Sequence, residues 1–235
     1  MRALPGSEML SLWERGAARH ALDRSALLAA AARPDWPAED IADLPLGAIN
    51  ASLLQLRMAC FGPRIDGHAD CPACGERLAL ALDVHELLGA ACEHDAPGST
   101  RGIEVAGLHV RAPTLRDLAA VAHEADAARA LLTHCTLAGD ASQLDDAALQ
   151  AVEQGLDALD PLADLALALQ CVACGHADLV QLDAGQLMWD ELEAQALRLL
   201  REVHLLASAY GWSEAQILAL TPARRASYLA MTGPP

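Results

Sequence analysis

Two copies of one short cysteine motif carry the clearest chemistry in this sequence. They are Cys71–Gly75 (CPACG) and Cys171–Gly175 (CVACG), and in each copy six residues separate the glycine from a Leu-Asp pair. Two cysteines three positions apart in a tight turn direct both thiolates at one ion, and the following glycine tolerates a positive φ. Two such pairs complete a tetrahedral shell. The sequence therefore predicts one structural Zn²⁺ per chain, bound by Cys71, Cys74, Cys171 and Cys174.

The residues around each motif predict antiparallel hairpins. Alternating apolar residues indicate strands on both sides of each cysteine pair, over 64–70, 76–83, 164–170 and 176–183. A redox-active Cys-x-x-Cys motif normally lies at a strand-to-helix junction instead. Two separate disulfides, or cysteines that persist after loss of the metal, stay open as alternatives. A closed four-thiolate shell has no free position for a substrate, so we expect a structural metal rather than a catalytic one.

Composition restricts the class of protein and its partners. The 235 residues are 53% hydrophobic and only 3% aromatic, and a chain rich in Ala and Leu favours helices. The formal charge of −16 opposes binding to nucleic acid, because such binding needs a basic face. We expect protein partners, no small-molecule substrate and no insertion into a membrane. The chain has seven cysteines, four of them in metal spacing, and no visible signal peptide. Both features predict that the protein resides in the reducing cytoplasm.

The chain order predicts an α+β protein, mainly α, with a small antiparallel β part built on a split four-cysteine zinc ribbon. Residues 1–63 are expected to form helices, among them one that is capped by Asp23 and runs to Ala32. Residues 64–183 form the split ribbon, with knuckles at 71–74 and 171–174. An insertion over 84–160 carries helices and a hairpin at 103–111, which could extend the ribbon's sheet. Residues 184–235 are expected to be helical, and the whole is expected to be one compact unit.

The C-terminal segment has the clearest helix signals. A broad apolar stripe predicts one long helix over 184–210, ended by Gly211. Ser213 and Gln216 form a capping box, and Pro222 occupies the first position of a further helix.

The same segment resembles a known family. Its matching residues are His204–Ala207, Tyr210–Glu214, Ile217–Leu220, Arg224-Arg225 and Tyr228-Leu229. Together they look like the C-terminal signature of the baseplate hub assembly chaperone family of T-even-type phages. An earlier run resembles members of that family from phage-tail-like contractile injection systems: Leu44–Gly47, Leu53-Leu54, Leu56-Arg57, Phe61–Pro63 and Cys71–Glu76.

The resemblance implies a non-enzymatic assembly factor or structural component of the baseplate hub. Its partners would be baseplate, hub, spike or tail-tube proteins, and the chain could become part of the assembled particle. Scarce aromatic residues and paired arginines often anchor protein interfaces. The candidate partner-binding residues are Tyr210, Trp212, Arg224, Arg225 and Tyr228.

Other readings stay open. A zinc-ribbon adaptor in transcription or nucleic-acid handling is the alternative function, and a cysteine-dependent enzyme would need one thiol with a pKa well below the others. Residues 92–95 (CEHD) resemble a second ligand cluster, although the polarity of a loop explains them equally well.

Overall fold

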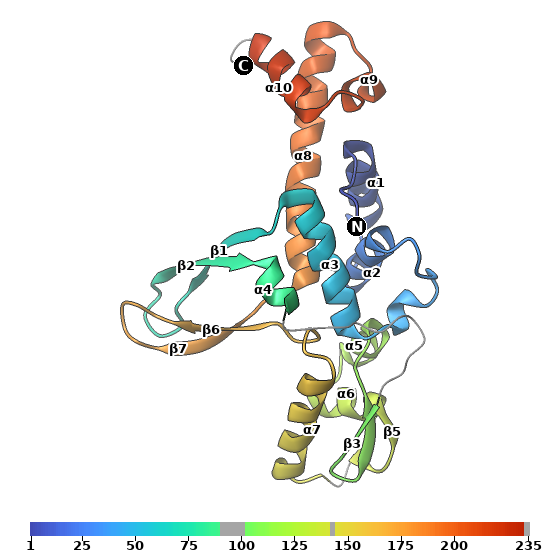
Figure 1. The fold of residues 1–235 in the computed structure, drawn as a ribbon, viewed down its shortest axis with the longest axis vertical. Coiled ribbons are helices and arrows are strands. Elements are labelled where there is room, and N and C mark those ends of the chain that lie inside the picture. Colours follow the sequence, from blue (N-terminus) through green and yellow to red (C-terminus); the bar gives the residue numbers. More distant parts are fainter. Residues whose placement is uncertain (90–101, 142–143, 233–235) are drawn as a thin grey trace.

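The computed structural model describes residues 1–89, 102–141 and 144–232. Over these residues the chain is mainly helical and carries three small antiparallel sheets. Figure 1 shows an elongated molecule in which one long helix runs along the main axis, an arm of hairpins projects to one side, and smaller helical parts lie at both ends. The predicted fold class is confirmed. Within the described residues, none of the helices has the length and apolar character needed to cross a membrane.

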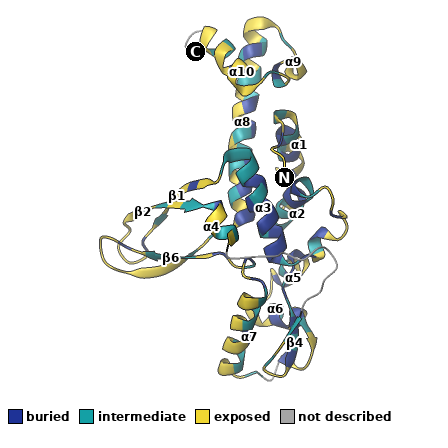
Figure 2. Cartoon of the chain, in the orientation of Figure 1, coloured by how far each residue is buried: buried dark blue, intermediate teal, exposed yellow. Residues whose placement is uncertain are grey.

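Four helices form the central body. These are α1 (Gly6–Gly16), α2 (Ala21–Ala32), α3 (Leu46–Phe61) and α8 (Ala184–Tyr210), with the short 3₁₀ helix η1 (Ile41–Asp43) before α3. Their apolar faces meet in the main hydrophobic cluster, which includes Leu28, Leu53, Trp189 and Leu192. Figure 2 shows α3 as the most continuously buried helix. A bidentate ion pair also joins α3 to α8, because the buried Arg57 guanidinium donates to both carboxylate oxygens of Glu191 at 2.8 and 2.9 Å.

Two hairpins form the arm. Strands β1 (Arg64–Asp70) and β2 (Arg77–Asp83) pair in one sheet, and β6 (Ala166–Gln170) and β7 (Ala177–Gln181) pair in another. The short helix α4 (Val84–Gly89) follows β2 and packs on α3. Each hairpin carries one cysteine motif at its turn. The two hairpins project side by side from the helical body, and their cysteine-bearing turns meet away from it (Figure 1).

The segment between the two hairpins has a hydrophobic cluster of its own. Strands β3 (Gly102–Val105), β4 (Leu108–Arg111) and β5 (Thr136–Ala138) form a three-stranded sheet. Helices α5 (Leu115–Val121), α6 (Ala127–Cys135) and α7 (Asp146–Leu159) accompany it. Leu108, Val110, Leu132 and Val152 are the centre of this second cluster. The predicted hairpin at 103–111 forms, but it pairs with β5 in a sheet separate from those of the two cysteine hairpins and does not extend the ribbon.

The C-terminal helices pack on the far end of α8. Helices α9 (Glu214–Leu218) and α10 (Pro222–Met231) follow Gly211, whose φ of 67° ends α8 in the left-handed region. Ser213 and Gln216 form the expected capping box, and Thr221 caps α10 with Pro222 in its first turn. The predicted range of the long helix and its stop signal are confirmed. Asp23 is not a cap, however, because the N-cap of α2 is His20, whose ring nitrogen accepts from the Leu22 N–H.

Candidate metal centre

The turn of each hairpin has the same geometry. The Cys71 N–H donates to the Glu76 carbonyl and the Gly75 N–H donates to the Cys71 carbonyl, at 2.9 and 2.8 Å. The corresponding bonds of the second knuckle are 2.8 and 2.9 Å. Gly75 and Gly175 both have φ of +75°, a conformation that glycine adopts without steric cost. The matched sequence motifs thus fold into matched turns, each of which presents two sulfurs on one side.

The two knuckles face each other and their four sulfurs converge. The Sγ atoms of Cys71, Cys74, Cys171 and Cys174 all lie within 4.8 Å of one another. Across the two hairpins, Cys71 Sγ is 3.7 Å from Cys174 Sγ, and Cys74 Sγ is 3.6 Å from Cys171 Sγ. Four sulfurs placed about 2.3 Å from one zinc ion at the corners of a tetrahedron would be about 3.8 Å apart. The cluster is therefore arranged to hold one metal ion, with one pair of ligands from each hairpin.

Backbone dipoles and neighbouring thiols act in opposite directions on these sulfurs. The Cys174 N–H donates to the Cys171 sulfur and is the main cause that lowers the pKa of that thiol to about 7. The Glu76 N–H acts to lower the pKa of Cys74, but the adjacent thiols, Cys174 first, hold that pKa at about 12. Four thiolates within a few ångströms of one another repel each other, and a bound cation offsets this repulsion. The chemistry of the four donors thus fits a divalent metal.

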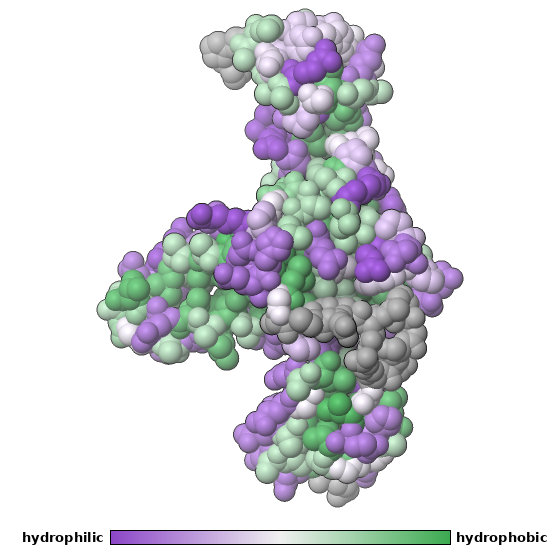
Figure 3. All heavy atoms as spheres, viewed as in Figure 1, coloured by the Kyte–Doolittle hydropathy of each residue, from purple (hydrophilic) through white to green (hydrophobic). Residues whose placement is uncertain are grey.

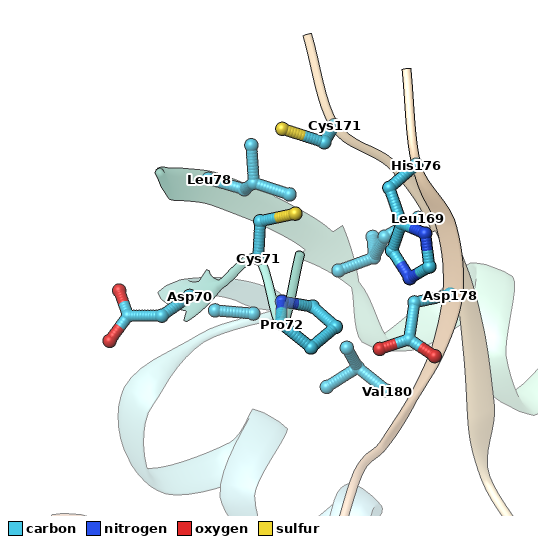
Figure 4. Close-up of a pocket in the computed structure, with 10 residues that line it drawn as sticks. Asp70, Cys71, Pro72, Leu78, Leu169, Cys171, His176, Asp178 and Val180 are labelled. Carbon is cyan, nitrogen blue, oxygen red and sulfur yellow. The ribbon is translucent and has the colours of Figure 1, made fainter. Parts of the chain in front are cut away.

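Apolar side chains pack between the two hairpins next to the cysteine cluster. Figure 4 shows Cys71 and Cys171 across a small gap between the hairpins, with Leu78, Leu169 and Val180 beside it. These three side chains come from β2, β6 and β7, so each hairpin contributes to the packing between them. Cys71 and Cys171 are 4% and 3% exposed, whereas Cys74 and Cys174 are exposed. The inner ligand of each pair is therefore shielded from water and the outer one lies at the surface.

The geometry favours metal binding over disulfide or redox chemistry for the two cysteine motifs. The cysteines are free thiols, and the distances of 3.6 and 3.7 Å far exceed the roughly 2.05 Å of a disulfide bond. Each motif lies between antiparallel strands and not at the strand-to-helix junction typical of redox-active cysteines. His68 and His176 are exposed, and among the residues that the structure describes the ligand cluster consists of the four motif cysteines. Residues 92–95, the other candidate cluster, lie outside the described residues.

The candidate partner-binding residues gather at the far end of α8. Tyr210 stacks on Trp212 with ring centroids 4.7 Å apart, and Tyr228 meets both rings edge-on at 5.7 and 4.9 Å. Arg224 is exposed and lies four residues, about one helical turn, before Tyr228 on α10. Arg225 is only 5% exposed, and its guanidinium bonds to Glu202 and to the Leu220 carbonyl. The surface available to a partner here thus consists of the rings and Arg224, because Arg225 holds α10 against α8.

Cys60 and Cys135, the two remaining cysteines among the residues that the structure describes, have structural surroundings. Cys60 accepts a hydrogen bond from the Leu4 N–H, and burial raises the pKa of its thiol. Burial also raises the pKa of Cys135 to about 11, so its thiolate is scarce at neutral pH. His134 precedes Cys135 on α6, but its side chain is exposed while that of Cys135 is buried. Neither thiol has the lowered pKa that nucleophilic catalysis requires.

One further surface was not identified from the sequence. An apolar groove of about 290 Å³ lies between α6 and α7, lined by leucines of both helices and by Val152. The sequence did contain a signal, since α7 repeats apolar residues at 149, 152 and 156 next to acids at 146, 153 and 157.

No family model, curated protein or solved structure matches the chain.

Proposed function

We propose that this chain is a non-enzymatic assembly factor or structural component of the baseplate hub of a phage-tail-like contractile injection system. In this proposal it works through protein–protein contacts, and one Zn²⁺ per chain stabilises its arm. The observation that carries the metal part of the proposal is the convergence of four thiols from two hairpins that lie about a hundred residues apart in the sequence. Four cysteine ligands fill a tetrahedral shell, so the metal would join the hairpins and would not bind a substrate.

Zinc is the ion that best fits this donor set. Soft thiolate ligands in a tetrahedral arrangement select zinc or iron over the hard cations magnesium and calcium. Metal analysis of the purified protein tests the assignment, and we expect about one zinc per chain. Two zinc ions per chain would indicate separate sites, and a preparation with iron or with no metal would contradict the zinc assignment.

The assignment to a baseplate rests on the sequence resemblance and is supported by the character of the C-terminal surface. The residues that carry the resemblance include Tyr210, Trp212 and Tyr228, which form the three-ring cluster. Partly exposed aromatic rings and arginines are typical anchors of protein interfaces. The charge of −16 supports protein partners over nucleic acid.

Affinity capture from the native cells tests the function. A tagged copy of the full chain is purified from lysate, and its partners are identified by mass spectrometry. We expect tube, spike or baseplate subunits. Presence in purified particles would define a structural component, and capture from lysate alone would define an assembly chaperone. Recovery of RNA polymerase or nucleic acid instead would overturn the proposal in favour of a zinc-ribbon adaptor.

A further inference from the structure

The groove between α6 and α7 is an apolar channel with walls of unequal charge. Its apolar lining includes Leu131, Leu132, Leu149, Val152 and Leu156. Leu132 and Val152 are also buried members of the second hydrophobic cluster, so the floor of the groove is continuous with packed core. Leu131, Leu149 and Leu156 remain partly exposed. Exposure of such a concave apolar surface to water is unfavourable, and burial under another apolar surface lowers the free energy.

The α7 wall carries a row of acids. Asp146, Glu153 and Asp157 are spaced by seven and four residues, so helical periodicity puts them on one edge of α7. Glu153 lines the groove, and all three residues are exposed. The sequence of α7 contains no Arg or Lys. Figure 3 shows hydrophilic side chains along the outer side of this part of the molecule, where α7 lies.

The α6 wall is balanced. Asp126, the N-cap of α6, and Arg129 both line the groove, and their charges pair at 3.7 Å. The groove therefore has one acidic rim and one nearly neutral rim. A ligand that fills it needs an apolar face and positive charge along only one of its two edges.

We propose that this groove binds an amphipathic helix of a partner protein whose apolar face is bordered on one edge by Lys or Arg. An amphipathic helix places apolar residues at i, i+3, i+4 and i+7, which matches a trough between two helices. Lys or Arg on one edge would lie against Asp146, Glu153 and Asp157. The unequal rims also fix the direction in which the helix lies, because reversal would place its positive edge beside the balanced wall.

This inference takes from the proposed function only that the chain acts through protein contacts. It holds for any partner with such a helix, and a purified protein suffices to test it. Failure to capture baseplate subunits would therefore leave it standing, and failure of the peptide test below would leave the baseplate proposal standing.

The probe is a fluorescein-labelled peptide of about 18 residues, long enough to form a helix, built from Leu, Ala and Lys. Leu forms one face and Lys one edge. Binding to the full-length protein is followed by fluorescence anisotropy, and we expect saturable binding that weakens as salt is added. A scrambled peptide of equal composition and a peptide with Glu in place of Lys should each bind at least about tenfold more weakly.

Charge variants test the acidic rim. The double variant Glu153→Lys with Asp157→Lys should weaken binding of the Lys peptide about tenfold or more. The double variant Glu14→Lys with Glu39→Lys changes the net charge equally at exposed positions of α1 and of the loop before η1. It should change the affinity less than about twofold. Equal effects of the two double variants would show that overall charge attracts the peptide, and would overturn the proposal.

Leucine variants test the apolar lining. Leu131→Ala removes a groove side chain, and Leu137→Ala removes one that is 48% exposed on β5 and does not line the groove. We expect about a fivefold or greater loss of affinity for the first variant and little change for the second. Circular dichroism of both variants checks that they fold. Similar affinities of the two variants would overturn the proposal.

Two other occupants would also overturn it. A second copy of the chain would appear in sedimentation as a dimer that the Glu153→Lys, Asp157→Lys variant abolishes and the Glu14→Lys, Glu39→Lys variant preserves. A bound lipid would appear in native mass spectrometry of the wild-type protein and would be lost from Leu131→Ala. A monomer with no bound small molecule is the expected result.

Discussion

The carboxylate of Asp160 accepts a hydrogen bond from the backbone N–H of Gly47 at 2.9 Å, although 113 residues separate them. Gly47 lies in the first turn of α3, where N–H groups have no partner within the helix. The N-cap of α3 is Pro45, whose side chain has no acceptor for these N–H groups. Asp160 supplies the missing cap, and the Pro113 carbonyl accepts from the Leu46 N–H at 2.9 Å. Two chain segments from the middle of the sequence thus stabilise the start of α3.

Gly47→Ala should destabilise the protein. A Cβ at this position would lie 1.7 Å from an oxygen of Asp160, so the carboxylate would have to move and its bond to the helix would be lost. We expect the free energy of unfolding to fall by about 1–3 kcal/mol, measured by urea denaturation.

Gly67→Ala is the matched control for this prediction. Its added Cβ would meet no atom within 4 Å, and Gly67 lies in β1. The substitution should leave stability unchanged or raise it slightly, since alanine restricts the unfolded chain. Equal losses for Gly47→Ala and Gly67→Ala would contradict the capping role of Asp160.

Short-range sequence patterns predicted most of the helices and hairpins but not the long-range contacts between them. The knuckle turns, both hairpins and the range of α8 follow from spacings within a few residues, and the shared cluster follows from the matched motifs. The bond between Gly47 and Asp160 leaves no such pattern, because each residue alone looks like an ordinary turn residue. Strand β5 is three residues long and too short to show alternation. Burial of Arg225 was equally hidden, since Glu202 belongs to a different helix.

Removal of the metal should loosen the arm and leave the helical body folded. The hairpins join through the four sulfurs and a small apolar contact, whereas α3 and α8 pack in the main cluster. A chelator, or Cys71→Ser with Cys171→Ser, should remove the metal and lower the melting temperature. Hydrogen exchange should speed up in β1, β2, β6 and β7 and change little in α3 and α8.

Cys60→Ser is the control for the metal ligands. Its sulfur accepts a bond from the Leu4 N–H, and a hydroxyl can accept the same bond. This variant should retain one metal per chain. Full metal content in Cys71→Ser with Cys171→Ser would contradict the shared site.

Asp117 should make stability depend on pH in the acid range. Burial acts to raise the pKa of its carboxyl, but hydrogen bonds from Arg111 and Thr114 outweigh it, and the pKa lies below the usual value. A carboxylate with a lowered pKa contributes stability above its unfolded pKa of about 3.9, and this contribution is lost as pH falls through the folded pKa. Asp117→Asn should therefore cost about 2 kcal/mol near pH 7, and the difference from wild type should shrink below about pH 4.

Urea denaturation between pH 3 and pH 7 measures this difference. Asp157→Asn, at an exposed position of α7, is the control and should change stability by less than about 0.5 kcal/mol throughout. A deficit of Asp117→Asn that is as large at pH 3 as at pH 7 would show that the ionised carboxylate is not the source of the stability.

The neighbouring residues Arg224 and Arg225 should separate binding from stability. The guanidinium of Arg225 lies 2.7 Å from Glu202 and 2.7 Å from the Leu220 carbonyl, and the residue is 5% exposed. Arg225→Ala leaves a half-buried carboxylate on α8 without its partner and should cost about 3 kcal/mol in thermal or urea unfolding.

Arg224→Ala should have the opposite profile. Its side chain is exposed one helical turn before Tyr228, so we expect stability to change by less than about 0.5 kcal/mol while capture of partner proteins from lysate weakens. The contrast is informative because the two arginines are adjacent on one helix and have the same charge. If Arg224→Ala captured partners as well as the wild type, the C-terminal surface would not be the interface. If Arg225→Ala kept full stability, the ion pair with Glu202 would not be what holds α10 against α8.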